Sequence, residues 1–196
     1  MKTVPELYAS PSLKKMTNIF NYTQVKYLRF KQGGIPLSCT NYSSFASNCY
    51  NLTEVPDLLF EGNKVTNVNN MFVYCSQITK YPDVMDFSNV TTNKANFWNN
   101  CNFLRQRIEK LPSKMIFPNV VSCQINQMGT IRRDTTARFD EENNLSGGWL
   151  YGWEKHPDAT SLSVKFNVSI SGWMTTEQVD SVVNHLESKG IYLYNL

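Results

Sequence analysis

The sequence predicts an α/β solenoid, a right-handed array of stacked coils with short parallel strands that ends in a C-terminal strand-helix-strand cap. Two observations predict this fold class. A phrase built around cysteine recurs with a period of about 26 residues, within the range typical of stacked units. The period is lost in the last third, where 161–196 has the pattern of a strand, a helix and a strand. Because so short a unit cannot bury an apolar face alone, such units stack on their neighbours.

The repeated phrase is clearest in NNMFVYCSQI, residues 69–78, and returns as NFWNNCNFL at 96–104. An aromatic residue or methionine stands four positions before each cysteine, and an aliphatic residue stands three positions after it. We interpret these positions as a structural ladder with one rung in each coil. Its members are Phe45, Met71 and Phe97, then Cys49, Cys75 and Cys101, then Leu52, Ile78 and Leu104.

Other features place elements within each unit. The short apolar segments 52–55 and 78–81 predict brief strands, and apolar positions three and four apart in 65–72 predict a helical turn or short helix. In the third unit the proline comes late, after an insertion at 105–110. Phe20 lies nearly one period before Phe45, so the chain opens in the middle of a repeat, either as a degenerate cap or as part of a longer array.

Residues 65–78, VTNVNNMFVYCSQI, resemble the BspA-like class of leucine-rich repeats, whose units carry a phrase of the type V-T-N-M-x-x-M-F-x-x-C-x-x-L. The resemblance covers about residues 13–128 and departs from the pattern at the insertion and after Cys123. It implies a leucine-rich-repeat-like array with a role in adhesion. The phrase GWMTTEQVDSVVNHLESKGI near the C-terminus also looks like the tail of repeat proteins encoded in Bacteroidetes and their phages.

The five cysteines predict packing rather than metal binding. They stand at positions 39, 49, 75, 101 and 123, with no C-x-x-C spacing and no nearby histidine pair. A thiol at a repeating position is small and apolar enough to fill a column of the core. A reactive thiol at Cys39 or Cys123 is the alternative. We expect no metal and no cofactor.

The last third predicts two segments after the array of residues 1–128. Residues 129–160 lose the period and predict an irregular aromatic loop insertion, whose candidate binding surface comprises Arg132, Arg133, Trp149, Tyr151 and Trp153. The alternative is that these aromatic residues fold back and plug the open end of the solenoid. In the cap, 161–196, Thr175 and Gln178 have capping-box spacing, and Gly190 predicts the end of the helix.

Charge and hydropathy exclude several classes of function. A formal net charge of +3 without a strong basic cluster gives no reason to expect a nucleic-acid partner. No stretch reaches the roughly 20 apolar residues of a membrane-spanning helix, so we expect no membrane insertion. The first residues contain no apolar core of a signal peptide, so we expect none in this chain.

These observations predict a non-enzymatic protein-interaction or adhesion module, located at the cell surface, in the extracellular space or on a phage virion. Its expected partner is a protein or a surface glycan. The alternative is a carbohydrate-active or other hydrolytic enzyme that uses the aromatic and acidic loop at 140–153, with Asp140 and Glu142 as candidate acids. Neither His156 nor His185 stands in a nucleophile-base phrase, which favours the non-enzymatic interpretation.

Overall fold

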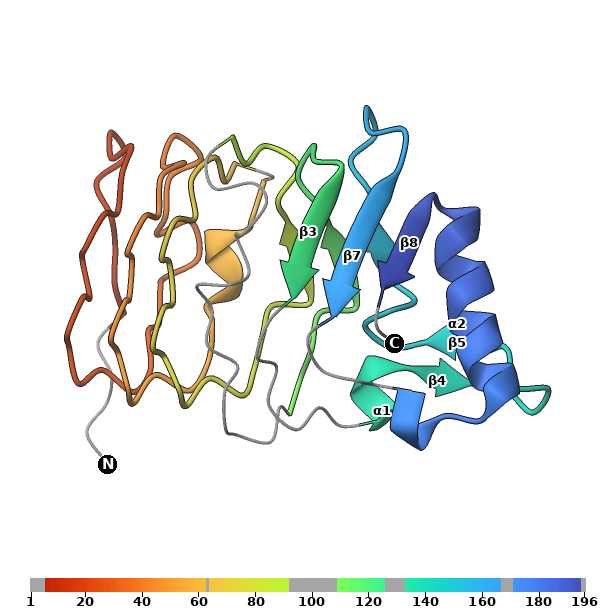
Figure 1. Cartoon of the computed structure of the whole chain (residues 1–196). Helices are drawn as coiled ribbons and strands as arrows, with labels where there is room; N and C mark the ends of the chain where they lie inside the picture. Colours follow the sequence, from red (N-terminus) through yellow and green to blue (C-terminus); the bar gives the residue numbers. More distant parts are fainter. Residues whose placement is uncertain (1–5, 63, 92–108, 126–132, 167–170, 195–196) are drawn as a thin grey trace.

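The computed structural model describes residues 6–62, 64–91, 109–125, 133–166 and 171–194. In these residues the chain runs in successive coils that lie side by side, and a helix packs at the C-terminal end of the row (Figure 1). The coils near the N-terminus consist of turns and single bridges, and the chain carries regular strands from β1 onward. The row of coils therefore follows the order of the sequence.

Backbone hydrogen bonds join each coil to the next with the period of the sequence. Lys15 pairs with Asn41, and Asn41 pairs with Asn67, in parallel bridges that are one period apart. Alternate N–H groups then donate to carbonyls of the following coil, from Tyr42 to Asn67, Ser44 to Asn69, Ala46 to Met71 and Asn48 to Val73. The sequence repeat is thus the repeat of the backbone ladder.

Of the helical turn or short helix predicted within 65–72, the short helix does not form. Residues 69–74 make consecutive turns, with positive φ angles of 55° at Asn70 and 61° at Tyr74. The same pair of positions is left-handed in the two preceding coils, at Asn18 and Tyr22 and then at Ser44 and Asn48. A left-handed residue at every fourth position interrupts an α-helix, because the right-handed helix requires negative φ throughout.

A first parallel sheet has the order β1-β2-β6, formed by Val84–Asp86, Lys114–Ile116 and Trp153–Glu154. Its inward column contains Met85, Met115 and Trp153, which are paired in register and buried. The predicted strands at 52–55 and 78–81 form only single bridges, Glu54 to Lys80 and Lys80 to Lys110. A 3₁₀ turn, η1 (Asp57–Leu59), follows the first of these.

A second parallel sheet has the order β3-β7-β8, formed by Ser122–Ile125, Leu162–Phe166 and Ile191–Tyr194. Helix α2 (Thr176–Ser188) connects β7 to β8 after the 3₁₀ turn η3 (Ser171–Trp173). The predicted capping box is confirmed, since Thr175 Oγ1 accepts from the Gln178 N–H and Gln178 Oε1 accepts from the Thr175 N–H. Gly190, with φ of 72°, ends the helix as predicted.

The sequence predicted an irregular segment at 129–160, and its described part, 133–160, contains regular elements. Helix α1 (Arg133–Thr136) leads into an antiparallel hairpin of β4 (Arg138–Phe139) and β5 (Leu145–Gly147). Strand β6 then returns to the first sheet and pairs with β2. The structure therefore replaces the expected loop with a small excursion that ends in another rung of the array.

The described ladder residues lie in the core, as the repeat predicted. Phe45 is the centre of an aromatic column, because its ring meets Phe20 and Phe72 edge-on at centroid distances of 5.3 and 6.0 Å. Six ladder residues are buried, namely Phe45, Met71, Cys49, Cys75, Leu52 and Ile78. The other three, Phe97, Cys101 and Leu104, lie outside the described residues.

The thiols of the ladder bind to the preceding coil. Cys49 Sγ donates to the Phe20 carbonyl at 2.7 Å, and Cys75 Sγ donates to the Ala46 carbonyl at 2.8 Å. Thr23 occupies the equivalent rung one period before Cys49, and its hydroxyl also donates to the Phe20 carbonyl. In this frame the residue one period before Phe45 is Ile19. The sequence had suggested Phe20, which is one position later.

The four described cysteines, at positions 39, 49, 75 and 123, are buried and reduced. Burial raises the pKa of the Cys39 thiol, and it raises the pKa of Cys123 to about 12. Both of these thiols are therefore protonated at neutral pH, and neither has the accessible thiolate that a reactive cysteine requires.

We predict that Cys75→Ala lowers the free energy of unfolding by about 1–3 kcal/mol, because it removes a buried donor and leaves a small cavity. Cys75→Ser retains a donor, as Thr23 does in its own rung, and we expect it to cost less than Cys75→Ala. Urea unfolding of both variants measures the difference. Equal stability of Cys75→Ala and the parent, with rapid alkylation of Cys75 in the folded protein, would contradict the buried ladder.

Candidate functional site

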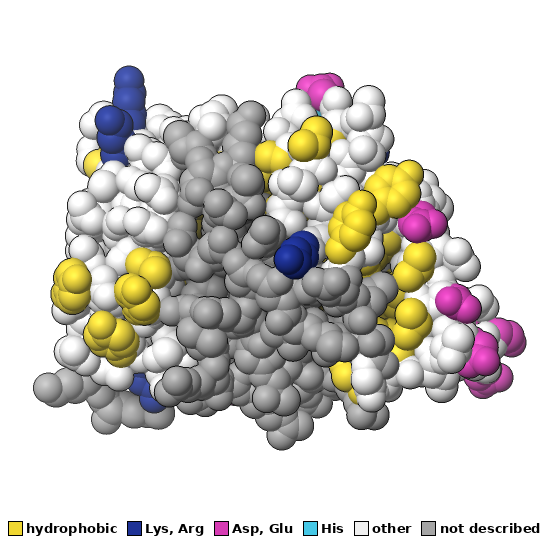
Figure 2. Space-filling view, viewed as in Figure 1, with side chains coloured by type: hydrophobic (Ala, Val, Ile, Leu, Met, Phe, Trp, Pro, Cys, Tyr) yellow, Lys and Arg dark blue, Asp and Glu magenta, His cyan; other side chains and the backbone are white. Residues whose placement is uncertain are grey.

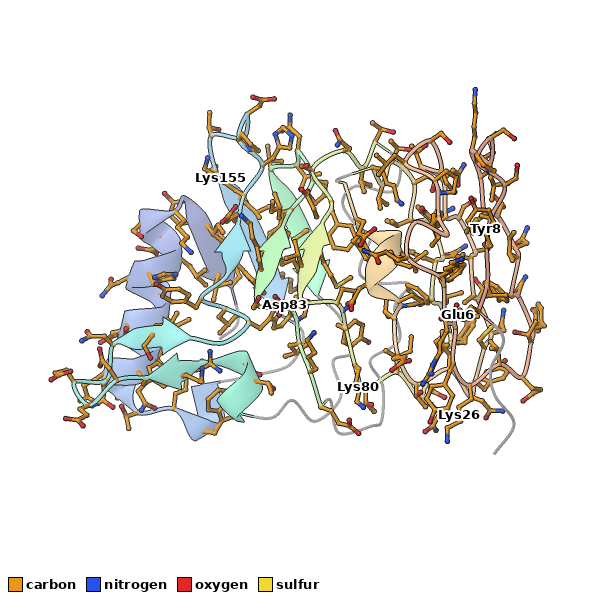
Figure 3. The ribbon with its side chains drawn as sticks, turned by 180° about the vertical axis from the view of Figure 1, so that it is seen from behind. Glu6, Tyr8, Lys26, Lys80, Asp83 and Lys155 are labelled. Atoms are coloured by element: carbon orange, nitrogen blue, oxygen red, sulfur yellow. The ribbon has the colours of Figure 1, made fainter. Side chains whose placement is uncertain are left out.

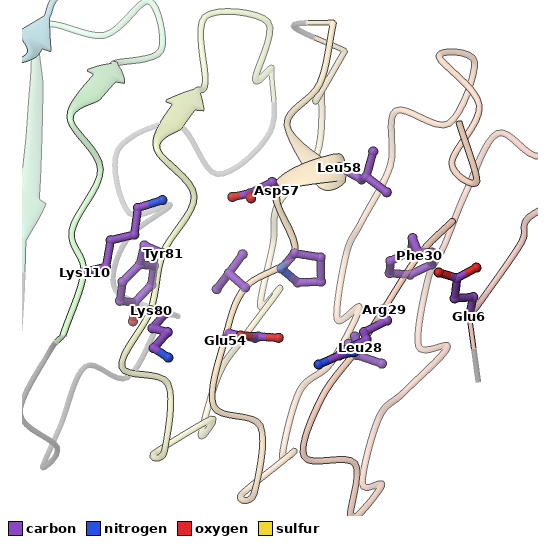
Figure 4. A pocket seen from close by; sticks show the side chains of 12 residues that line it. Glu6, Leu28, Arg29, Phe30, Glu54, Asp57, Leu58, Lys80, Tyr81 and Lys110 are labelled. Atoms are coloured by element: carbon purple, nitrogen blue, oxygen red, sulfur yellow. The ribbon is translucent and has the colours of Figure 1, made fainter. Parts of the chain in front are cut away.

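A groove crosses several coils on the side of the single bridges (Figure 4). Figure 3 labels two of its lining residues, Glu6 and Lys80, on the whole chain. The volume of the groove is about 390 Å³. Each coil that the groove crosses supplies one or more of the lining residues. The lining residues are Glu6, Leu28, Arg29, Phe30, Glu54, Val55, Pro56, Asp57, Leu58, Lys80, Tyr81 and Lys110.

The backbone ladder explains why charged side chains project into this groove. Glu54, Lys80 and Lys110 are bridge partners in successive coils, so they form one column. The residues that follow the first two of them, Val55 and Tyr81, turn the other way and are buried. Successive residues of an extended segment point to opposite sides, which separates an outer charged column from an apolar floor.

Charge is unevenly distributed along the groove. Lys80 and Lys110 stand together at the end nearer β1, whereas Glu54 and Asp57 lie in the middle (Figure 4). Lys80 Nζ forms an ion pair of 3.2 Å with Glu109, and both side chains are about half exposed. Such an exposed pair contributes little to stability, so these charges are available to orient a ligand.

Apolar residues supply the floor and one wall. Leu28, Val55 and Tyr81 are buried beneath the charged column, and Phe30 is half-buried beside them. Pro56 and Leu58 belong to the turn around η1. The groove therefore combines an apolar base with charged rims, the arrangement of surfaces that bind an extended chain.

The described lining residues form no catalytic grouping of the nucleophile-base kind, since they include no histidine, cysteine, serine or threonine. Among the described residues, no group of three or more His, Cys, Asp or Glu side chains is placed to hold a metal ion. In the part of the chain that the structure describes, no helix combines the length and apolar character that crossing a membrane demands.

The binding surface predicted at the aromatic segment is wrong for its two tryptophans. Trp149 and Trp153 have no exposed surface, and their rings meet each other edge-on at 5.0 Å. Trp153 also packs against Phe117 of the array at 5.1 Å. These two indoles fold back into the core, the alternative that the sequence left open. Arg133 begins α1, and Arg132 lies outside the described residues.

Tyr151, the remaining predicted contact residue, joins the array to helix α2. Its ring stacks on His185 with centroids 4.7 Å apart, and its carbonyl accepts from His185 Nε2 at 3.0 Å. Lys189 Nζ donates to the same carbonyl at 2.7 Å. Burial is the main cause that lowers the pKa of His185, and the nearby charge of Lys189 lowers it further. The exposed tyrosine therefore holds the cap in place.

The acids of the predicted hydrolytic site have a structural role in the hairpin. Asp140 Oδ1 accepts from the N–H groups of Glu142 and Asn144, at 3.1 and 2.7 Å. Its second oxygen accepts from the Asn144 side chain. This carboxylate closes the turn between β4 and β5, as aspartate commonly does in turns. Because the indoles are buried, the structure does not bring the acids and an aromatic platform together.

No protein-family model, curated protein or solved structure matches this chain. The resemblance to BspA-like repeats therefore remains a prediction carried by the residues of the array. The groove residues were missed from the sequence, although a signal was present. Glu54 and Lys80 stand one period apart, at the same place relative to Cys49 and Cys75, so the repeat frame itself marks them as one column.

We predict that the free energy of unfolding falls as pH is lowered through about 6.5, and that His185→Gln reduces this dependence. The pKa of His185 is lower in the folded state, so as pH falls the unfolded chain takes up its proton first and is stabilised relative to the folded chain. Urea unfolding at pH 7.5, 6.5 and 5.5 compares parent and variant. If the free energy of unfolding of His185→Gln fell between pH 7.5 and pH 5.5 by as much as that of the parent, the assignment would be contradicted.

Proposed function

We propose that this chain is a leucine-rich-repeat-like solenoid that acts as a non-enzymatic interaction or adhesion module. The observation that carries the proposal is the groove across successive coils, which has an apolar floor and a charged column. Stacked repeats offer extended binding surfaces of this kind. The resemblance of residues 65–78 to BspA-like repeats supports the same role and favours a place on a bacterial cell surface or a phage virion.

The shape and charge of the groove favour an extended segment of a partner protein. A segment that runs across the coils places alternate side chains over the floor formed by Leu28, Val55 and Tyr81. Its acidic side chains match Lys80 and Lys110, and basic ones match Glu54 and Asp57 in the middle. Such complementarity sets the direction of the bound segment and excludes segments of the opposite charge order.

We predict that peptides selected by the purified protein from a displayed random library carry acidic residues next to apolar ones. Replacing both lysines, as Lys80→Glu with Lys110→Glu, should weaken the binding of a selected peptide about tenfold or more, because it places like charges against the peptide. Isothermal titration calorimetry measures this change. The control is Lys165→Glu, the same kind of change at one exposed lysine of β7, outside the groove.

Two outcomes would contradict the proposal. Equal weakening by Lys165→Glu would show that overall charge, rather than the groove, determines binding. Hydrolysis of a glycan panel by the parent, lost in Asp140→Asn, would show an enzyme instead of a binding module. Labelling of intact cells or virions with an antibody against the chain tests the proposed location.

A further inference from the structure

Two exposed tyrosines occupy a backbone conformation that a bulky residue rarely adopts. Tyr22 and Tyr74 have φ angles of 57° and 61°, and the equivalent residue of the coil between them, Asn48, has 60°. Asparagine and glycine tolerate this region best, whereas a large side chain is strained there. The chain therefore places tyrosine twice at a position where asparagine would cost less free energy.

Burial does not offset this strain. Tyr22 is 71% exposed and Tyr74 is 54% exposed, so neither ring contributes a buried face comparable to that of the core aromatics. Residues held in strained backbone conformations cluster at functional sites. Figure 2 shows hydrophobic side chains gathered over the N-terminal coils, and the exposed apolar residues of these coils include Ile19 and Tyr50 besides these two.

The surface around the tyrosines is rich in amides that are already ordered. Asn48 Nδ2 donates to Asn21 Oδ1 at 3.3 Å, and Asn51 Nδ2 donates to Gln24 Oε1 at 2.7 Å. The Tyr50 hydroxyl donates to Asn48 Oδ1 at 3.4 Å. We call this surface the tyrosine strip, and its members are Tyr22, Tyr50, Tyr74, Asn21, Gln24, Asn48 and Asn51.

The tyrosine strip carries no formal charge. Residues 17–24, 43–52 and 69–78 of three successive coils contain no lysine, arginine, aspartate or glutamate. A ligand that is recognised here gains nothing from its own charge, which excludes phosphate-bearing and strongly acidic partners. Flat apolar rings beside paired donors and acceptors match a ligand with apolar faces and many hydroxyl groups.

The spacing of Tyr22 and Tyr74 along the backbone ladder also fits such a ligand. Backbone bonds join the coils of Tyr22 and Asn48, and then those of Asn48 and Tyr74. Two steps of a parallel ladder place equivalent residues roughly 10 Å apart. This distance is close to the length of two pyranose rings in an extended glycan, so both tyrosines can contact sugars of one chain.

We propose that the tyrosine strip is a binding site for a neutral oligosaccharide. The rings of Tyr22 and Tyr74 stack on the apolar faces of two sugar rings, and the amides of Asn48 and Asn51 bind their hydroxyl groups. The inference rests on the proposed function as a binding module, but it uses none of the residues of the groove.

The test is the titration of cellohexaose, mannohexaose and chitohexaose into the full chain, monitored by calorimetry, with polygalacturonate as the charged comparison. We expect at least one neutral hexasaccharide to bind. Tyr22→Asn and Tyr74→Asn should each weaken it about tenfold, the loss expected for one stacking contact. Because asparagine occupies the equivalent position naturally, these variants should retain or exceed the thermal stability of the parent, so a loss of binding does not reflect unfolding.

The groove variant, Lys80→Glu with Lys110→Glu, should bind the hexasaccharide as the parent does. The proposal is overturned if no neutral hexasaccharide binds, if polygalacturonate competes equally well, or if both asparagine variants bind with unchanged affinity. It is also overturned if the asparagine variants weaken only the selected peptides, since the strip would then dock protein. If the groove bound the selected peptides but no glycan bound, this inference would be wrong. The proposed function would still hold.

Discussion

The structure depends on one constraint, the hydrogen bonding of each coil's backbone to the next coil in parallel register. The N–H groups of alternate residues donate to carbonyls of the following coil, and bridged residues such as Lys15, Asn41 and Asn67 are one period apart. Buried peptide groups must find partners, so a coil that returned out of register would leave donors and acceptors unpaired. This requirement forces equivalent residues into columns.

The columns that face inward explain the composition of the repeat. Rings, thiols and aliphatic side chains meet similar neighbours one coil away, which keeps the packing similar from rung to rung. The register tolerates a change of length where the chain leaves the ladder and returns. Lys80 pairs with Lys110, the last residue of the insertion at 105–110, at an offset longer than one period. Trp153 rejoins the column of Met85 and Met115 after a still longer excursion.

The columns that face outward can carry function, because they contribute little to the core. One of them presents Glu54, Lys80 and Lys110 to the groove, and another presents Tyr22 and Tyr74 to solvent. The same periodicity that stabilises the interior therefore places surface side chains in linear arrays. A charged array and an uncharged one suit different ligands, so the two binding sites that we propose would select partners of different chemistry.

The amino-acid sequence by itself determined the period, the inward residues of the rungs that the structure describes and the limits of helix α2. These depend on local spacing and on chemistry within one unit, such as the capping box at Thr175 and the stop at Gly190. Tertiary structure alone decided the fate of Trp149 and Trp153, because burial depends on whether a distant strand, β2, is there to pair with β6. It also decided that residues 69–74 form turns instead of continuing a helix from 65–72, since hydrogen bonds to a neighbouring coil replace those that a helix would make within itself.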